Sequence, residues 1–129
     1  MSKIPDDLRY TEDHEYVKTS ADANVVHVGI TDHAQSELGD VVYVELPKVG
    51  ATLAGGEAFG TIEAVKAVSD LLTPVAGTVT AINDAIAGDP AVVNRDPYGA
   101  GWMIKLRVKD PAELKTLLGS AEYKKHVGE

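Results

Sequence analysis

One lysine stands in the middle of a long β-type run: residues 60–72 read GTIEAVKAVSDLL. Small and β-branched residues dominate this run, and no glycine or proline interrupts it after Gly60. Residues 57–72 are too many for one strand of a small domain, where strands are usually about five or six residues long. We therefore expect the run to fold back on itself as a hairpin near Lys66, with the lysine at the turn.

Further short strands are expected on both sides of this hairpin. β-branched or alternating residues predict them over residues 16–19, 25–30, 41–46, 78–82 and 102–108. Residues 53–59 (LAGGEAF) are similar to residues 86–92 (IAGDPAV), and a valine-rich strand precedes each copy. The expected fold class is therefore mainly β, a sandwich or half-barrel of two similar halves with short helices appended.

The helical signals are few and short. A capping box that begins at Asp32 predicts a short helix that ends at Gly39. The C-terminal helices are expected within residues 111–127. The sequence DPAE at residues 110–113 places a capping aspartate before a proline and begins the first of them, and Ser120 begins the last.

Length and composition describe one ordinary globular domain. The 129 residues are 44% hydrophobic and 25% charged, which excludes disorder as the state of the whole chain. Area scaling for 13.6 kDa predicts about 6,600 Å² of exposed surface after folding. We expect a single domain over residues 1–129, with its core in about residues 15–109 and a loose polar arm over residues 1–13.

Charge and the lack of cysteine exclude several functions. Twenty acidic against twelve basic residues give a net charge of −8, so neither nucleic acid nor a membrane surface is an expected partner. The sequence has no cysteine, which excludes disulfides, thiolate metal sites and a cysteine nucleophile. No apolar run approaches the roughly 20 residues of a bilayer span. Without a visible leader segment, we expect a cytoplasmic protein of a bacterial cell.

No catalytic constellation and no metal site is visible in the sequence. The four histidines lack metal-ligand spacing, and the serines lack a nucleophile-elbow context. The glycine-rich residues 50–60 match neither phosphate-binding pattern. A turn cluster at residues 94–99 is a candidate contact surface through Arg95 and Tyr98.

Lys66 is the remaining candidate for chemistry. It is the only lysine between Lys48 and Lys105, and small or β-branched neighbours leave its amine unobstructed on a stiff segment. The functional interpretation is a presented amine that another enzyme acylates. A solvated lysine on a strand is the common alternative, because single surface lysines are frequent.

Several blocks of the sequence together resemble glycine cleavage system H proteins, a family of lipoyl carriers. The segment EAVKAVSDL at residues 63–71 is similar to the family's lipoylation segment. Other similar blocks are HEYV (14–17), GITDHAQ (29–35), LGD (38–40), VELP (44–47), Asn94 with DPYG (96–99), and GWMIK (101–105). The resemblance covers nearly the whole chain and implies a lipoyl-domain-like fold.

The resemblance implies a monomeric carrier subunit without catalytic activity of its own. Lipoate is expected in amide linkage to Lys66. Glycine decarboxylase (the P protein) loads this arm with an aminomethyl group in the family. The tetrahydrofolate-dependent aminomethyltransferase (the T protein) receives it, and dihydrolipoamide dehydrogenase (the L protein) reoxidises the arm.

The resemblance also implies roles for four carboxylates. Glu63 is similar to the position that lipoylating enzymes read near the lysine. Asp13, Glu15 and Asp70 match positions where the loaded arm docks on the carrier's own surface. Its cationic amine makes carboxylates the expected neighbours there.

Three other functions are alternatives. An H-like protein can donate its lipoyl group to other lipoyl domains in a lipoate relay, and its lysine segment would look the same. The carboxylates Asp13, Glu15 and Asp70 favour the glycine role. A biotin carrier places methionine on both sides of its lysine, where this chain has Val65 and Ala67. A stand-alone enzyme is disfavoured by the missing catalytic constellation.

Overall fold

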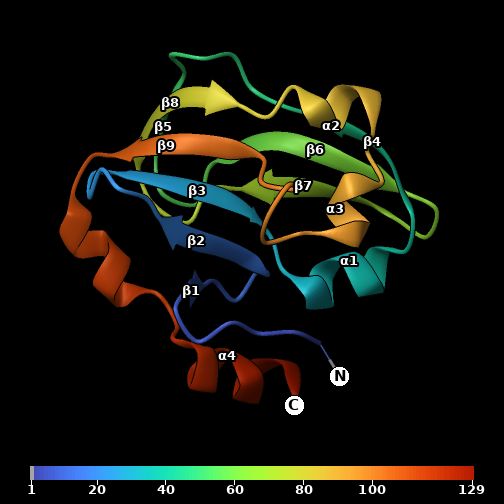
Figure 1. The fold of residues 1–129 in the computed structure, drawn as a ribbon. Helices are drawn as coiled ribbons and strands as arrows, with labels where there is room; N and C mark the ends of the chain where they lie inside the picture. Colours follow the sequence, from blue (N-terminus) through green and yellow to red (C-terminus); the bar gives the residue numbers. More distant parts are fainter. Residues whose placement is uncertain (1) are drawn as a thin grey trace.

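Two antiparallel sheets and a few short helices form the fold of the computed structural model, which describes residues 2–129 (Figure 1). The strands are β1 (Arg9–Tyr10), β2 (Glu15–Thr19), β3 (Val25–Ile30), β4 (Val41–Glu45), β5 (Thr52–Leu53), β6 (Ala58–Ala64), β7 (Val68–Leu72), β8 (Gly77–Ile82) and β9 (Ile104–Val108). The helices are α1 (Asp32–Leu38), α2 (Ala85–Gly88), α3 (Val92–Arg95), the 3₁₀ helix η1 (Pro111–Thr116) and α4 (Ser120–Val127).

The strands divide into a six-stranded and a three-stranded sheet. The larger sheet has the order β1-β2-β3-β9-β8-β5, and the smaller one has the order β4-β6-β7. Each strand expected from the sequence is present, with ends that differ by no more than two residues. The mainly β class with short helices is thus confirmed. Within residues 2–129 no helix has the length and hydrophobicity that crossing a membrane requires.

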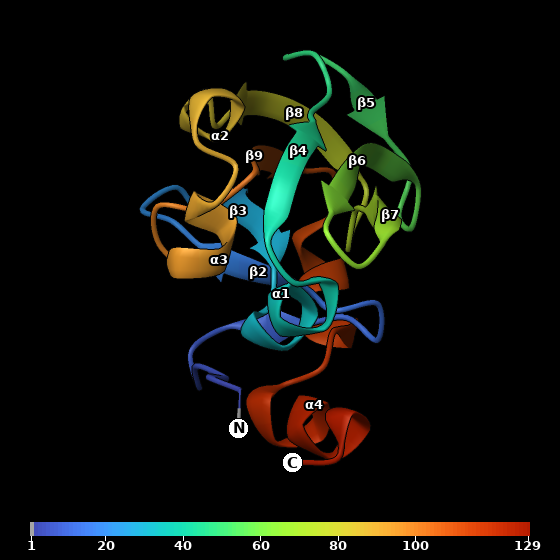
Figure 2. The same cartoon turned by 90° about the vertical axis from the view of Figure 1, so that its right-hand side faces the viewer.

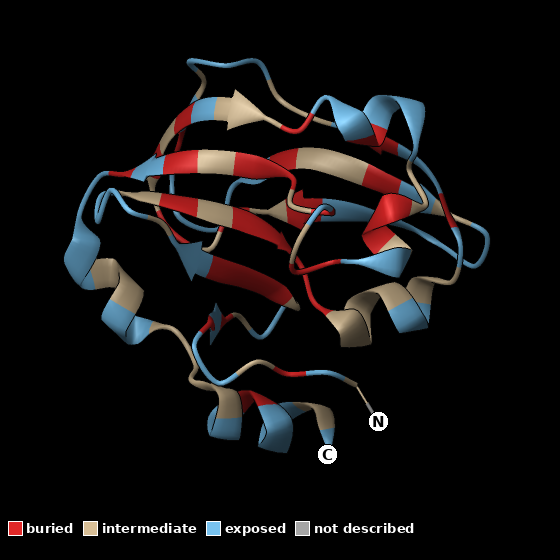
Figure 3. Ribbon diagram, in the orientation of Figure 1, coloured by how far each residue is buried: buried red, intermediate tan, exposed pale blue. Residues whose placement is uncertain are grey.

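The main core lies between the two sheets. Fully buried aliphatic side chains of both sheets meet there, among them Val28, Ile62 and Leu106. Figure 3 shows the buried residues along the strands and the exposed ones on the outer helix surfaces. The accessible surface is 6528 Å², close to the value that area scaling predicts.

A second, smaller core fixes the N-terminal segment. Ile4, Leu8 and Tyr10 are buried, so the loose arm expected over residues 1–13 is wrong for the described residues 2–13. The Tyr10 ring stacks on that of Tyr123 in α4, with centroids 4.7 Å apart. Figure 2 shows α4 and the N-terminal segment together at one end of the molecule. The apolar residues are too sparse in this polar stretch to produce a periodic signal.

Two helix caps lie one residue before the expected positions. Thr31, rather than Asp32, caps α1, and its side chain accepts a hydrogen bond from the backbone of Ala34. Gly119, rather than Ser120, precedes α4, and its amide donates to the side chain of Glu122 at 3.1 Å. The cap expected at Asp110 is confirmed, although the helix that follows is 3₁₀.

The two similar segments do not adopt similar structures. Residues 53–59 run from β5 into β6, whereas residues 86–92 belong to the helical connection of α2 and α3. Their likeness is therefore one of small residues rather than of a structural repeat.

Candidate functional site

The lysine hairpin is formed by β6 and β7. Its register pairs Glu63 with Val68, and the amide of Ala64 donates to the carbonyl of Ala67 at 2.9 Å. Lys66 lies in the turn between them and is exposed. The structure thus places the lysine at the tip of a hairpin, as the sequence predicts.

Backbone hydrogen bonds hold this turn against the connection between α1 and β4. The amide of Val65 donates to the carbonyl of Asp40 at 2.9 Å, and the amide of Lys66 donates to the carbonyl of Leu38 at 3.2 Å. Two successive amides of the turn are thereby fixed to another segment of the chain. The turn is stiff at the residue that carries the amine.

Gly39 makes room for the lysine side chain. Its φ of 78° and ψ of −160° lie in a region that only glycine adopts without strain. A Cβ at Gly39 would be 3.4 Å from Cγ and Cδ of Lys66. The aliphatic stem of the lysine therefore lies along bare backbone.

Asn94 supports the same connection, a role that the sequence does not indicate although Asn94 belongs to one of the blocks that resemble the family. Its Nδ2 donates to the carbonyl of Gly39 and to Oε1 of Gln35, each at 2.9 Å. Its Oδ1 accepts from the amide of Val41, also at 2.9 Å. A turn-rich context hides this role, because asparagine is common in turns for local reasons.

A pocket of about 130 Å³ lies beside the hairpin, between β7, α1 and the start of β2. Asp13, Glu15 and Asp70 all line it, so the structure brings together three carboxylates that are far apart in the sequence. Glu37 of α1 adds a fourth. The apolar part of the lining comes from Ile30, Ala34, Leu38, Ile62 and Leu71. Neither Lys66 nor Glu63 lines this pocket.

Glu15 is the buried member of the group. It is 3% exposed, and it accepts hydrogen bonds from Oγ1 of Thr11 at 3.0 Å and from the amide of Leu72 at 3.4 Å. Burial raises the pKa of Glu15 from its usual 4.5 to about 8, because these two bonds only partly replace the lost water. The carboxyl group therefore holds a proton at neutral pH while no cation is near.

His14 gives the pocket wall its shape. It has a left-handed backbone conformation with a φ of 70°, which breaks the alternation of side chains along an extended segment. As a result Asp13, His14 and Glu15 all line the pocket. Nδ1 of His14 is hydrogen-bonded to the hydroxyl of Tyr123 at 2.8 Å. The same hydroxyl is 2.7 Å from Oγ1 of Thr31.

Three of the four histidines converge beside this wall. The rings of His33 and His126 have centroids 4.9 Å and 5.7 Å from that of His14. Burial, followed by these two rings, lowers the pKa of His14. No group of metal-ligand geometry occurs among residues 2–129, so the convergence is a packing contact between the start of β2, α1 and α4.

The candidate contact surface at residues 94–99 is only partly exposed. Tyr98 is buried, and its hydroxyl donates to the carbonyl of Lys3 at 2.6 Å and accepts from the amide of Asp32 at 2.9 Å. Arg95 is exposed and pairs with Asp89. Tyr98 therefore serves the fold, and its role as a contact residue is wrong.

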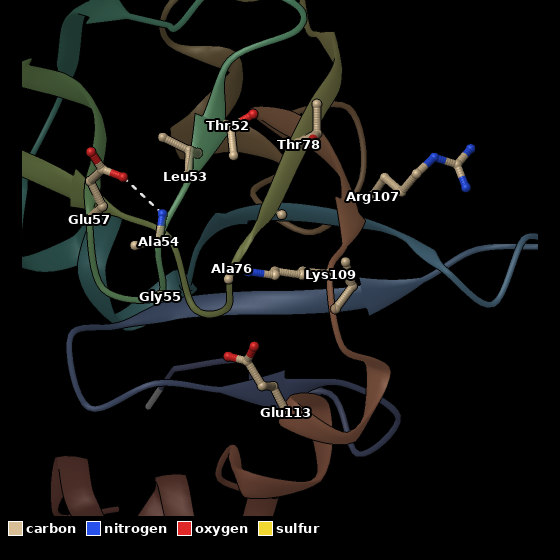
Figure 4. Close-up of a pocket in the computed structure, with 12 residues that line it drawn as sticks. Thr52, Leu53, Ala54, Gly55, Glu57, Ala76, Thr78, Arg107, Lys109 and Glu113 are labelled. Atoms are coloured by element: carbon tan, nitrogen blue, oxygen red, sulfur yellow. Dashed lines mark hydrogen bonds between the residues drawn. The ribbon is translucent and has the colours of Figure 1, made fainter.

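A larger pocket of about 660 Å³ lies away from the lysine, along β5, β8 and the end of β9 (Figure 4). Of its charged lining residues, Arg107 points away from the others in Figure 4. Glu57 uses its carboxylate to accept from the amide of Ala54 at 2.8 Å. These features give the larger pocket no set of groups directed at a common ligand.

Comparisons with known proteins agree with this geometry. The sequence model of the family described as Glycine cleavage H-protein matches residues 8–129. Glycine cleavage system H proteins of Opitutus terrae and Chlorobium limicola are 52% and 55% identical over 128 and 127 residues. These matches cover 99% and 98% of this chain, and 100% and 98% of the relatives.

A solved structure gives the same result. The crystal structure of a glycine cleavage system H protein from Mycobacterium marinum superposes with a TM-score of 0.88 at 40% identity. It covers 98% of this chain and 100% of its own. A full-length match in sequence and in fold leads to one conclusion: this chain belongs to the glycine cleavage H-protein family, the non-catalytic carriers of covalently attached lipoate in the glycine cleavage system.

Proposed function

We propose that lipoate is amide-linked to Lys66 and that the whole chain acts as one monomeric carrier domain. The single observation that carries this proposal is the exposed amine at a hairpin tip whose backbone is bound to the α1–β4 connection. A rigid tip fixes where the arm begins, and the flexible arm supplies the reach. Acylation also removes the charge of Lys66.

The residues around Lys66 fit such an arm. Bound lipoate supplies a disulfide ring that accepts the one-carbon group and is reduced. The lack of a side chain at Gly39 lets the stem of Lys66 lie along the backbone there. Tethering then replaces repeated encounters in solution by a local search at high effective concentration.

The carboxylate pocket is the place where the loaded arm docks. An amine at the end of the arm is cationic, and Asp13, Glu15 and Asp70 converge in the pocket beside the hairpin. A cation near Glu15 favours its ionised form and lowers its pKa. Docking therefore releases the proton that Glu15 holds in the empty pocket. The apolar lining excludes water from the docked group.

The partners follow from the family. The arm visits glycine decarboxylase, the aminomethyltransferase and dihydrolipoamide dehydrogenase, and Glu63 is read by the enzymes that attach lipoate. Bacterial relatives support a place in the bacterial cytoplasm. A role as a donor in lipoate relay is not favoured, because the relatives carry the name of the glycine cleavage component.

The test combines mass analysis with reconstitution. Protein made in a glycine-degrading bacterium should carry one lipoyl-sized mass increase, and peptide mapping should place it on Lys66. With the P, T and L proteins, the wild-type chain should support glycine decarboxylation and Lys66→Arg should not. Lys48→Arg is the matched control, because Lys48 is also exposed but lies outside the hairpin. Activity of Lys66→Arg, or label on another lysine, would contradict the proposal.

A further inference from the structure

Exposed apolar side chains gather around the lysine turn. Among residues 2–129, five large hydrophobic side chains are at least half exposed, and four of them are Val42, Tyr43, Val65 and Val68. The exposed fractions of Val65 and Val68 are 71% and 65%. The fifth, Val49, lies on the connection between β4 and β5. Apolar groups that cluster in this way mark interaction sites.

The strand register places two of these residues in one row across the sheet. Tyr43 on β4 is paired with Glu63 on β6, which is paired with Val68 on β7. Cross-strand partners point to the same face of a sheet, so these residues form a row across the outer face, and Val65 follows in the turn. Figure 2 shows the three strands side by side with the turn at their end. We call Tyr43, Val65 and Val68 the apolar strip.

Carboxylates lie within and beside the apolar strip, because Glu63 stands between Tyr43 and Val68 in the row. Asp40, Glu45, Glu63 and Asp70 are exposed on the same strands and connections. Residues 37–72 contain six acidic residues and only two lysines, and acylation removes the charge of one of these. Complementary charge on a partner therefore means a rim of arginine and lysine around an apolar centre.

The short reach of an unmodified lysine decides which partner needs this surface. The Lys66 side chain has a four-carbon stem, and that stem lies against Gly39. An enzyme that acylates Lys66 must bring its active site to the turn itself and cover Val65 and Val68. Later partners meet the end of a much longer arm and can work farther from the turn.

We propose that the apolar strip is the docking surface for the enzyme that attaches lipoate to Lys66. This inference rests on the proposed function. The enzyme presents an apolar patch with a basic rim and a lipoyl group activated at its carboxyl carbon. The Lys66 amine forms the amide bond to that carbon, loses one proton and displaces the activating group.

The experiment measures acylation rates on the unmodified full chain. A lipoate–protein ligase with lipoate and ATP acts on increasing concentrations of carrier, and intact mass follows the product. Tyr43→Ser/Val68→Ser should raise the KM for the carrier roughly tenfold, equivalent to about 1.4 kcal/mol, with kcat changed less than about twofold. Val49→Ser removes an equally exposed valine elsewhere and should leave KM unchanged. Added salt should raise the wild-type KM.

Each outcome decides between the two proposals. An unchanged KM in the double variant, or an equal rise in Val49→Ser, overturns the docking surface, while labelling of wild-type Lys66 still upholds the carrier function. Failure to label wild-type Lys66 overturns both. Should the double variant unfold in urea earlier than wild type, the single variant Val65→Ser in the turn provides the same test.

Discussion

Replacing Glu15 by glutamine should change how stability depends on pH. The unfolded chain releases the Glu15 proton near its usual pKa of 4.5, whereas burial raises the pKa of Glu15 in the folded chain to about 8. Between these values the folded state holds more protons, so the free energy of unfolding falls as pH rises. At about 1.4 kcal/mol per pKa unit, the loss is roughly 3–5 kcal/mol by pH 8.5.

Urea unfolding at pH 4.5 and pH 8.5 measures this loss. Glu15→Gln cannot ionise, so it should lose less stability than wild type over this range by roughly 3–5 kcal/mol. The lowered pKa of His14 makes the folded state bind fewer protons, so His14 changes the pH dependence of stability in the opposite direction. This change is the same in wild type and in Glu15→Gln and does not affect their difference. Glu12→Gln, which removes an exposed carboxylate three residues earlier, should follow wild type. Equal losses in wild type and Glu15→Gln would refute the reasoning.

Three further substitutions test the supports of the site by urea unfolding. Gly60→Ala should lower the free energy of unfolding by about 3 kcal/mol or more, because an added Cβ would overlap the carbonyl oxygen of Glu45. Gly88→Ala is the control: its added Cβ would meet no atom within 4 Å, so the free energy of unfolding should change by less than about 1 kcal/mol. Tyr123→Phe should cost about 1–3 kcal/mol, because two hydrogen-bonded side chains lose their shared partner. Asn94→Ala should lower the free energy of unfolding by about 3 kcal/mol, since three hydrogen bonds disappear. It should also slow acylation of the lysine. Unchanged stability in Tyr123→Phe or in Asn94→Ala would contradict the role assigned to that residue.

The strands could be predicted because their signals are local. Hydrophobic alternation and turn residues act over a few positions, and the length of the run around Lys66 by itself requires a hairpin. Strands β1 and β5 were not predicted, since each has two residues and exists only through its neighbour in the sheet. The burial of the N-terminal segment was not predictable either, because it depends on the stacking of Tyr10 on Tyr123, which is distant in the sequence.

The site was predictable only in part, for a related reason. The exposed lysine follows from its own neighbours, but the pocket combines Glu15 of β2 with Asp70 of β7, which residue types alone cannot pair. The resemblance to the family supplied that pairing. Its blocks include His14 and Asn94, but it supplied neither the left-handed backbone of His14 nor the three hydrogen bonds of the Asn94 side chain. The apolar strip likewise required the register of three strands.

In the docking role proposed for this pocket, the protonated state of Glu15 distinguishes two forms of the same arm. An arm that ends in a neutral group does not stabilise the ionised form of Glu15, because a buried carboxylate without a partner is unfavourable. An arm that ends in a cation supplies the partner, so the proton leaves and a charge-assisted hydrogen bond replaces it. Because one proton is released, affinity for the cation rises with pH up to the pKa of about 8 and then levels off. In that proposal, the burial of Glu15 makes the docked state specific to the loaded arm.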